Sequence, residues 1–260
     1  MRKHWKAFTA VGVVVLVIAV AAVLINRPAP AAPSQDPSPL QATGKFGFPV
    51  SDVKIGDGGT KKASDDKTPT GYSGTCESAA QAAANYTRLI KDVHLTTWAQ
   101  QKKTLTEVSQ PGRWVEKVTF EGNLLTDAKD LPASAFDGGW YTRTDVAAGG
   151  MYRVASCEEK KRAVVQVFTG GIGASASEEP SSFFQTVTFE LVWGGDWKIS
   201  DAGTVPVGQD FGGRVKDGGP MSVGTNMDAE SAPVLRDDLV NAFFKNKSRE
   251  GWVEYANAKR

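Results

Sequence analysis

The apolar positions of this chain begin with one uninterrupted run. From Ala7 to Ile25 the sequence holds no charged residue and is broken only by Thr9 and Gly12. Nineteen residues at a helical rise of about 1.5 Å cover roughly 28 Å, close to the thickness of the bilayer hydrocarbon. The pattern predicts a transmembrane helix over residues 7–26, preceded by a short leader, residues 1–6.

The basic residues around this run predict its orientation. Arg2, Lys3 and Lys6 precede the run, and Arg27 alone follows it. The positive-inside rule then places the leader in the cytoplasm and the rest of the chain outside it, extracellular or periplasmic. A cleaved signal peptide is the alternative, because Ala19-Val20-Ala21 has cleavage-like spacing. The length of the run favours a retained anchor in the cell membrane.

Polar and turn-forming residues dominate the next stretch, residues 27–75. It contains seven of the thirteen prolines, together with many Gly, Ser, Asp and Lys residues. Such a composition buries too little apolar surface to offset the entropy of ordering, which predicts a disordered Pro/Gly-rich linker. Phe46 and Phe48 are the exception: they either dock on the domain or a partner, or form a stray aromatic pair.

Helical spacing of apolar residues starts near Cys76. An Ala-rich helix is predicted over residues 77–95, and a second from Thr96 or Thr97 to the Pro111-Gly112 stop. Residues 113–131 fit a helix by the spacing of their apolar side chains, but Val118-Thr119-Phe120 is typical of a strand. We favour a third helix there.

Strand patterns follow Pro132. Alternating polar and apolar residues around Val187 predict a sheet with one buried face and one wetter face. Residues 207–226 are Gly-rich and loop-like, and Pro233 opens a terminal helix. These patterns predict an α+β domain over 76–208, with helices packed on a curved antiparallel sheet, and a Gly-rich loop with a C-terminal helix over 209–260. The expected strands are 140–146, 151–156, 163–169, 183–193 and a return strand from Trp197.

Charge and chemistry narrow the function classes. The formal charge is +1, but residues 7–260 carry 27 basic and 29 acidic residues, about −2, whereas nucleic-acid-binding domains are normally basic. No direct nucleic-acid binding is expected. Outside the leader the only histidine is His94, and the two cysteines lie far apart. We therefore expect no catalytic residue, no metal site and no cofactor.

The two cysteines, Cys76 and Cys157, both lie in the part expected to be exported, and no third cysteine competes. An oxidising compartment favours a disulfide between them, closing a loop of about 80 residues. Two separate buried thiols are the alternative, because sequence does not give the distance between the two Cα atoms.

Several short segments and the order of the expected elements carry a resemblance to known proteins. The segments are Pro69-Thr70-Gly71-Tyr72, Cys76-Glu77, Ala82-Ala83-Ala84-Asn85-Tyr86, Gly138-Gly139-Trp140, Asp145-Val146-Ala147, Val192-Trp193-Gly194-Gly195-Asp196-Trp197-Lys198-Ile199 and Gly251-Trp252-Val253-Glu254-Tyr255. The order of helices and then a four- or five-stranded sheet resembles nuclear-transport-factor-2-like (NTF2-like) cone domains. With a single span and a Pro-rich tether, the chain also resembles actinobacterial membrane proteins of mobile elements, over residues 69–200 and loosely in the tail. By topology the likeness extends to single-pass scaffold subunits of type IV secretion and conjugation machines.

This resemblance implies a membrane-anchored, non-enzymatic scaffold or assembly subunit of a cell-envelope machine, with conjugative DNA transfer as the expected process. Its partners would be other protein subunits and further copies in a homo-oligomer. The alternative is an exported small-ligand-binding protein or a cone-fold enzyme of isomerase or dehydratase type, with Asp145, Tyr141 and Tyr152 as the reacting groups. Apolar side chains expected to contact partners are Phe46, Phe48, Phe243, Phe244 and Trp252.

Overall fold

The computed structural model describes residues 42–91, 98–127, 141–175, 178–203, 221–225 and 235–260. Contacts divide the chain into two units, residues 1–40 and 41–260, and the described residues all belong to the second. The expected leader, the transmembrane helix over 7–26 and His94 lie outside the described residues. Within the described ranges, no helix is long and apolar enough to cross a membrane.

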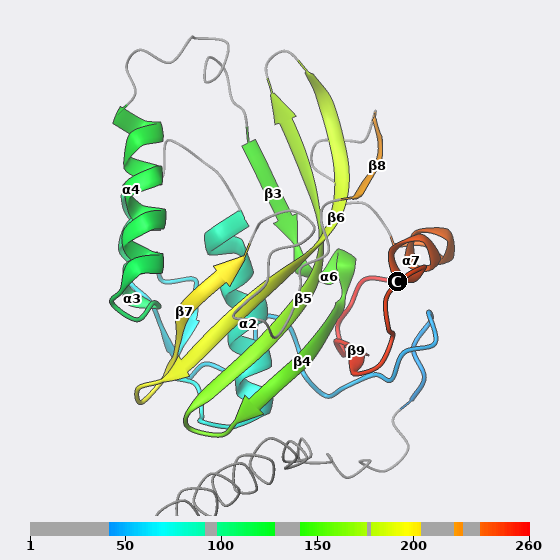
Figure 1. The fold of residues 1–260 in the computed structure, drawn as a ribbon, viewed down its shortest axis with the longest axis horizontal. Coiled ribbons are helices and arrows are strands. Elements are labelled where there is room, and N and C mark those ends of the chain that lie inside the picture. Colours follow the sequence, from blue (N-terminus) through cyan, green and yellow to red (C-terminus); the bar gives the residue numbers. More distant parts are fainter. Residues whose placement is uncertain (1–41, 92–97, 128–140, 176–177, 204–220, 226–234) are drawn as a thin grey trace, which may run out of the picture. The chain divides into compact units, whose positions relative to one another are not determined.

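A seven-stranded antiparallel sheet forms the centre of the unit. Its main strand order is β7-β6-β5-β4-β9, while β3 pairs with β5 and β8 pairs with β6 (Figure 1). The strands are β3 (Tyr141–Asp145), β4 (Met151–Glu158), β5 (Arg162–Ser175), β6 (Glu178–Trp193), β7 (Trp197–Gly203), β8 (Met221–Thr225) and β9 (Trp252–Glu254).

The long hairpin of β5 and β6 links both halves of this sheet. One edge of β5 pairs with β4 as far as Phe168, and then with β3 from Gly170 onward. The change of partner is possible because a short helix, α6 (Val146–Gly149), joins β3 to β4. Gly149 allows the close approach, since a Cβ there would lie 2.2 Å from the Phe168 carbonyl oxygen.

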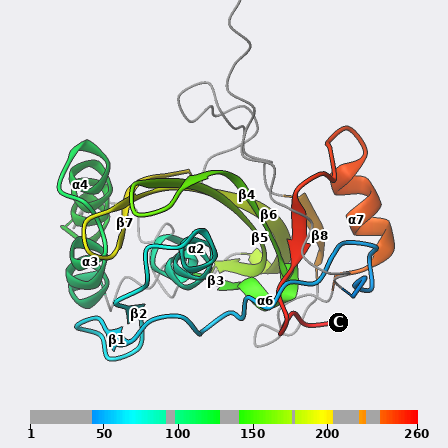
Figure 2. The same ribbon diagram turned by 90° about the horizontal axis from the view of Figure 1, so that it is seen from below.

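Helix α2 (Cys76–Lys91) lies on the concave side of the curved sheet, as Figure 2 shows. Its alanines let the helix backbone approach the strands: Ala79, Ala80, Ala82 and Ala83 are completely buried. Helices α3 (Trp98–Glu107) and α4 (Arg113–Asp127) lie beside β7, and α7 (Asp237–Phe244) lies at the other end of the sheet. The expected α+β class, with helices on an antiparallel sheet, is confirmed.

Two local expectations need correction. The strand expected over 140–146 ends at Asp145, because the Asp145 carboxylate accepts hydrogen bonds from the backbone of Ala147 and Ala148 and caps α6. The Gly-rich stretch 207–226 was expected to be loop, but its last residues form β8. This strand forms because residues 181–184 of β6 offer it an edge with which to pair. Local sequence does not reveal such a distant partner.

The expected linker over 27–75 extends too far. From residue 42 onward the chain lies on the folded unit, and Phe46, Phe48, Val53 and Tyr72 are at most 5% exposed. Two short strands, β1 (Lys61–Lys62) and β2 (Pro69–Thr70), form a separate hairpin within this segment. Composition misled here because a few apolar side chains, spaced widely among polar ones, dock on distant elements.

The predicted disulfide is present and joins Cys76 to Cys157, with 5.9 Å between the Cα atoms. Cys76 is the first residue of α2, and Cys157 lies near the end of β4. The bond therefore holds the start of the central helix against the sheet.

Replacing both cysteines (Cys76→Ser with Cys157→Ser) should lower the free energy of unfolding by about 4 kcal/mol, because the unfolded chain regains the entropy of a large loop. Urea unfolding of both proteins, with and without dithiothreitol, measures this. Reductant should destabilise the wild type and leave the double variant unchanged. Equal stability of the oxidised wild type and the double variant would contradict the assignment.

Candidate functional site

The five apolar residues expected to contact partners pack together inside the unit. None of their side chains is more than 7% exposed. The Phe48 and Phe244 rings lie 5.2 Å apart, and the Phe244 and Trp252 rings 5.6 Å apart. Apolar side chains mark an interaction surface when they are exposed, and these five are buried against one another and their neighbours. The cluster they form contains Phe46, Phe48, Met151, Phe168, Phe184, Leu235, Val240, Phe243, Phe244 and Trp252.

Two of the three residues named for the enzyme alternative, Asp145 and Tyr152, have structural roles. Asp145 caps α6 and pairs with Lys259. Tyr152 is buried with its ring 4.6 Å from that of Tyr255, and burial raises the pKa of Tyr152 to about 12. The Tyr141 side chain lies outside what the structure describes. Asp145 and Tyr152 are thus both engaged in contacts that stabilise the fold.

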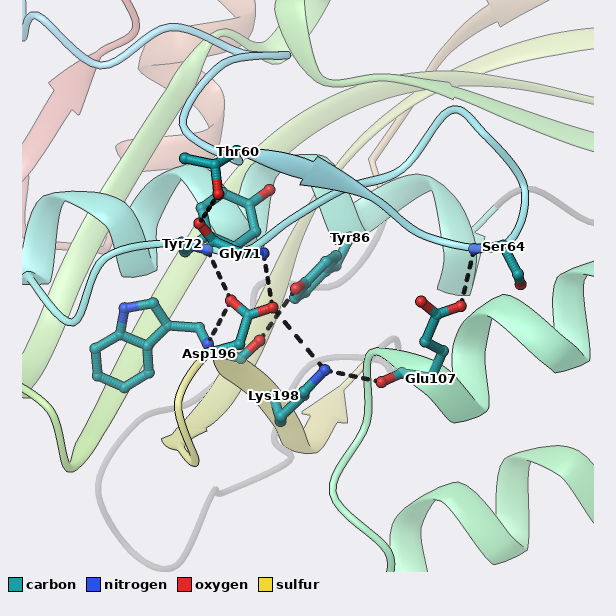
Figure 3. A network of polar contacts seen from close by, with 9 residues as sticks. Thr60, Ser64, Gly71, Tyr72, Tyr86, Glu107, Asp196 and Lys198 are labelled. Carbon is teal, nitrogen blue, oxygen red and sulfur yellow. Dashed lines mark hydrogen bonds and ion pairs between the residues drawn. The ribbon is translucent and has the colours of Figure 1, made fainter.

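A polar network holds the segment before α2 against the β6–β7 turn (Figure 3). The Asp196 carboxylate accepts hydrogen bonds from the backbone of Gly71 at 2.8 Å and Tyr72 at 2.9 Å. Lys198 lies 3.9 Å from Asp196 and donates to the Glu107 carbonyl at 3.0 Å. The Glu107 carboxylate in turn accepts from the Ser64 backbone at 2.8 Å. Hydrogen bonds therefore hold both the loop of the β1–β2 hairpin and the residues that follow β2.

Asn85 and Tyr86 of α2 complete this attachment. The Tyr86 hydroxyl donates to the Trp197 carbonyl at 3.0 Å, and burial raises the pKa of Tyr86. The Asn85 side chain donates to the Tyr72 hydroxyl at 2.8 Å and accepts from the Gly56 backbone at 2.8 Å. The helix thereby fixes the position of the chain that crosses it.

A groove of about 790 Å³ lies beside this attachment. The segment 55–69, α2, α3 and the β3–α6 junction form its walls. We define the basic groove by these residues: Ile55, Gly56, Lys62, Asp65, Lys67, Thr68, Pro69, Ala84, Asn85, Arg88, Leu89, Gln100, Gln101, Thr104, Arg143, Thr144, Asp145, Val146 and Ala147.

The charged side chains of the basic groove are unequal in number. Among the described residues that line it, four are basic and two are acidic, a surplus of two positive charges. Asp65 is occupied within its own turn: its carboxylate accepts from the backbone of Lys67 and Thr68 and from the Thr68 hydroxyl. Partial burial alone would raise the pKa of Asp65, but these hydrogen bonds lower it below its ordinary value. The groove is thus suited to an anionic group.

Sequence reasoning missed the basic groove because Lys62 and Lys67 fall in the stretch expected to be linker. The turn from Asp65 to Thr68, with its side-chain-to-backbone hydrogen bonds, is a local sign of order there. Within the described ranges, no group of three or more His, Cys, Asp or Glu side chains could hold a metal ion.

No family model matches the chain, and neither a curated protein nor a solved structure matches it.

Two buried tyrosines provide a matched test of this geometry. Tyr86→Phe should lower the free energy of unfolding by about 1–2 kcal/mol, because the Trp197 carbonyl loses its hydroxyl donor. The Tyr255 hydroxyl is buried and has no hydrogen-bond partner among the described residues. Tyr255→Phe should therefore leave the stability unchanged or raise it by about 1 kcal/mol. Urea unfolding at pH 7.5 measures both, and equal losses in the two variants would contradict the assignment.

The Asp196 contacts can be tested by amide hydrogen exchange. Asp196→Ala should speed the exchange of the Gly71 and Tyr72 amides at least tenfold, because both lose their acceptor. Asp52 is an exposed carboxylate in the same N-terminal segment, and Asp52→Ala serves as the control that leaves these amides protected. Unchanged exchange in Asp196→Ala would show that the segment is held in another way.

Proposed function

We propose that the chain is a membrane-anchored, non-enzymatic scaffold or assembly subunit of a cell-envelope machine, with residues 42–260 acting outside the membrane through protein contacts. The observation that carries the proposal is the filled concave side of the sheet. Val165, Val187 and Phe189 face α2 and are completely buried, as are Ala79 and Ala83 of the helix. A cone-fold enzyme or small-ligand carrier whose site lies between α2 and these strands would need space there, and the side chains of the two elements fill it.

The disulfide supports an exported location. Structural disulfides persist in oxidising compartments and are rare in the cytosol. The Cys76–Cys157 bond closes 81 positions of sequence and lies at the base of the central helix. This agrees with the anchor and orientation expected from the uncharged run and its basic leader.

The assignment to conjugative DNA transfer comes from the resemblance of residues 69–200 to NTF2-like scaffold domains. Three helices, α2, α3 and α4, precede the main strands of a curved antiparallel sheet, which is the order that the resemblance implies. Fold alone does not establish function. The process is therefore proposed on the combination of anchor, tether and domain order.

Deleting the coding region in its native element should reduce DNA transfer at least a hundredfold, and the full chain supplied in trans should restore it. The matched control is the same domain exported from a cleavable signal peptide without residues 1–26. It should fail to restore transfer, because a released subunit is no longer held at the membrane.

In-cell crosslinking of the full chain should capture a large complex. Unchanged transfer after deletion, together with no captured complex, would contradict the scaffold role. Full restoration by the released domain would contradict the need for an anchor.

A further inference from the structure

We propose that the basic groove binds an acidic, extended segment of a partner protein. In this arrangement the partner's carboxylates contact Lys62, Lys67 and Arg143. Its apolar side chains contact the aliphatic residues of the groove lining. The inference rests on the proposed scaffold role, which it deepens by naming the chemistry of one partner.

Charge is the first argument. Lys67 and Arg143 are exposed and line the groove from different elements, one from the loop of the β1–β2 hairpin and one from β3. The acidic groups of the groove are already engaged, Asp65 within its turn and Asp145 with α6 and Lys259. The groove is therefore locally positive, although residues 7–260 as a whole carry about −2. Complementary charge favours an acidic partner and steers its encounter.

The lining of the groove also contains apolar side chains. Ile55, Pro69, Ala84, Leu89 and Val146 contribute aliphatic surface beside the basic residues of the same lining. A simple inorganic anion would leave this surface unused. About 790 Å³ falls within the range of sites that bury ligands of several hundred daltons, which suits a short peptide segment carrying both carboxylates and apolar groups.

The residue types in the lining also favour a protein partner over a nucleic acid. Proteins that bind single-stranded nucleic acid combine basic grooves with aromatic side chains on which bases stack. None of the described residues that line the basic groove is aromatic. The walls are fixed before binding, since Asn85 holds Gly56 and the Asp196 network holds the hairpin. A groove fixed in this way loses little entropy when a partner binds.

The test uses the full chain in detergent and a fluorescent dodecapeptide made of repeated Glu-Glu-Leu units. Fluorescence anisotropy measures the binding of the peptide to the chain. A peptide with every Glu replaced by Gln, a twelve-nucleotide oligothymidylate and free glutamate are the comparison probes.

The groove variant is Lys67→Glu with Arg143→Glu. The matched control is Arg113→Glu with Lys245→Glu, which makes the same charge change at exposed positions on α4 and just after α7. Thermal unfolding checks that both variants fold. If the charge-reversal groove variant does not fold, Lys67→Ala with Arg143→Ala takes its place.

The Glu peptide should bind at least tenfold more tightly than the Gln peptide, and its affinity should fall as salt is raised. The groove variant should weaken binding about tenfold or more, and the control variant less than twofold. Equal affinity for the two peptides, or an unchanged groove variant, would overturn the proposal. Tighter binding of the oligonucleotide would overturn it in favour of nucleic acid, and competition by free glutamate at equal concentration in favour of a small-ligand site.

In-cell crosslinking separates this proposal from the scaffold role. Capture of the same complex by the wild type and the groove variant would overturn the groove proposal and leave the scaffold role standing. Capture by the wild type and the control variant, with loss in the groove variant, would support both. If the wild type captures no complex and deletion leaves DNA transfer unchanged, the scaffold role fails, and the peptide titration alone decides whether the groove binds an acidic segment.

Discussion

The packing of α2 against the concave face of the sheet is the contact on which the rest of the unit depends. The helix is held at three points: Cys76 is bonded to Cys157, Ser78 accepts a hydrogen bond from the Trp197 indole at 3.1 Å, and the Tyr86 hydroxyl donates to the Trp197 carbonyl. Between them the small alanine side chains set the distance from helix to strands. A larger residue at Ala79 or Ala83 would force the long β5–β6 hairpin outward, since both alanines are completely buried.

Because α2 fills the concave side, the segments at both ends of the described chain pack on other surfaces. The N-terminal segment crosses α2 and forms one wall of the basic groove, held by Asn85 and Asp196. The segment around Phe46 meets β9 through Glu254, a carboxylate only 2% exposed that pairs with Arg260 at 2.8 Å. The Phe46 amide also donates to this carboxylate. One buried acid thus joins segments about 200 positions apart.

Local sequence pattern was enough for the elements whose order comes from their own periodicity. Helices α2 and α3 follow from it, as do the expected parts of β5 and β6, although both strands begin or end several residues beyond the expected ranges. Helix α4 forms where the apolar spacing fitted a helix but Val118-Thr119-Phe120 is typical of a strand. The disulfide follows instead from the presence of two cysteines in the part of the chain expected to be exported. Prediction from local sequence failed where contacts with a distant part of the chain stabilise the element. Strand β8 forms on an edge of β6, and Phe46 and Phe48 bury themselves against α7 and β9. The basic groove combines a supposed linker with α2, α3 and β3, so no single window of sequence contains it.

The interior between α2 and the strands that carry Val165 and Val187 is closed, and this closure supports the proposed role through contacts of the outer surface. Methyl nuclear magnetic resonance of the full chain, titrated with small apolar ligands such as octanol and indole, tests whether this interior binds a ligand. We expect no saturable shift of the Val165, Val187 or Leu191 methyl signals, because these side chains are completely buried in the core that α2 forms with the sheet. Saturable shifts confined to these signals would reveal an interior ligand site, and the proposed role through surface contacts would lose its support.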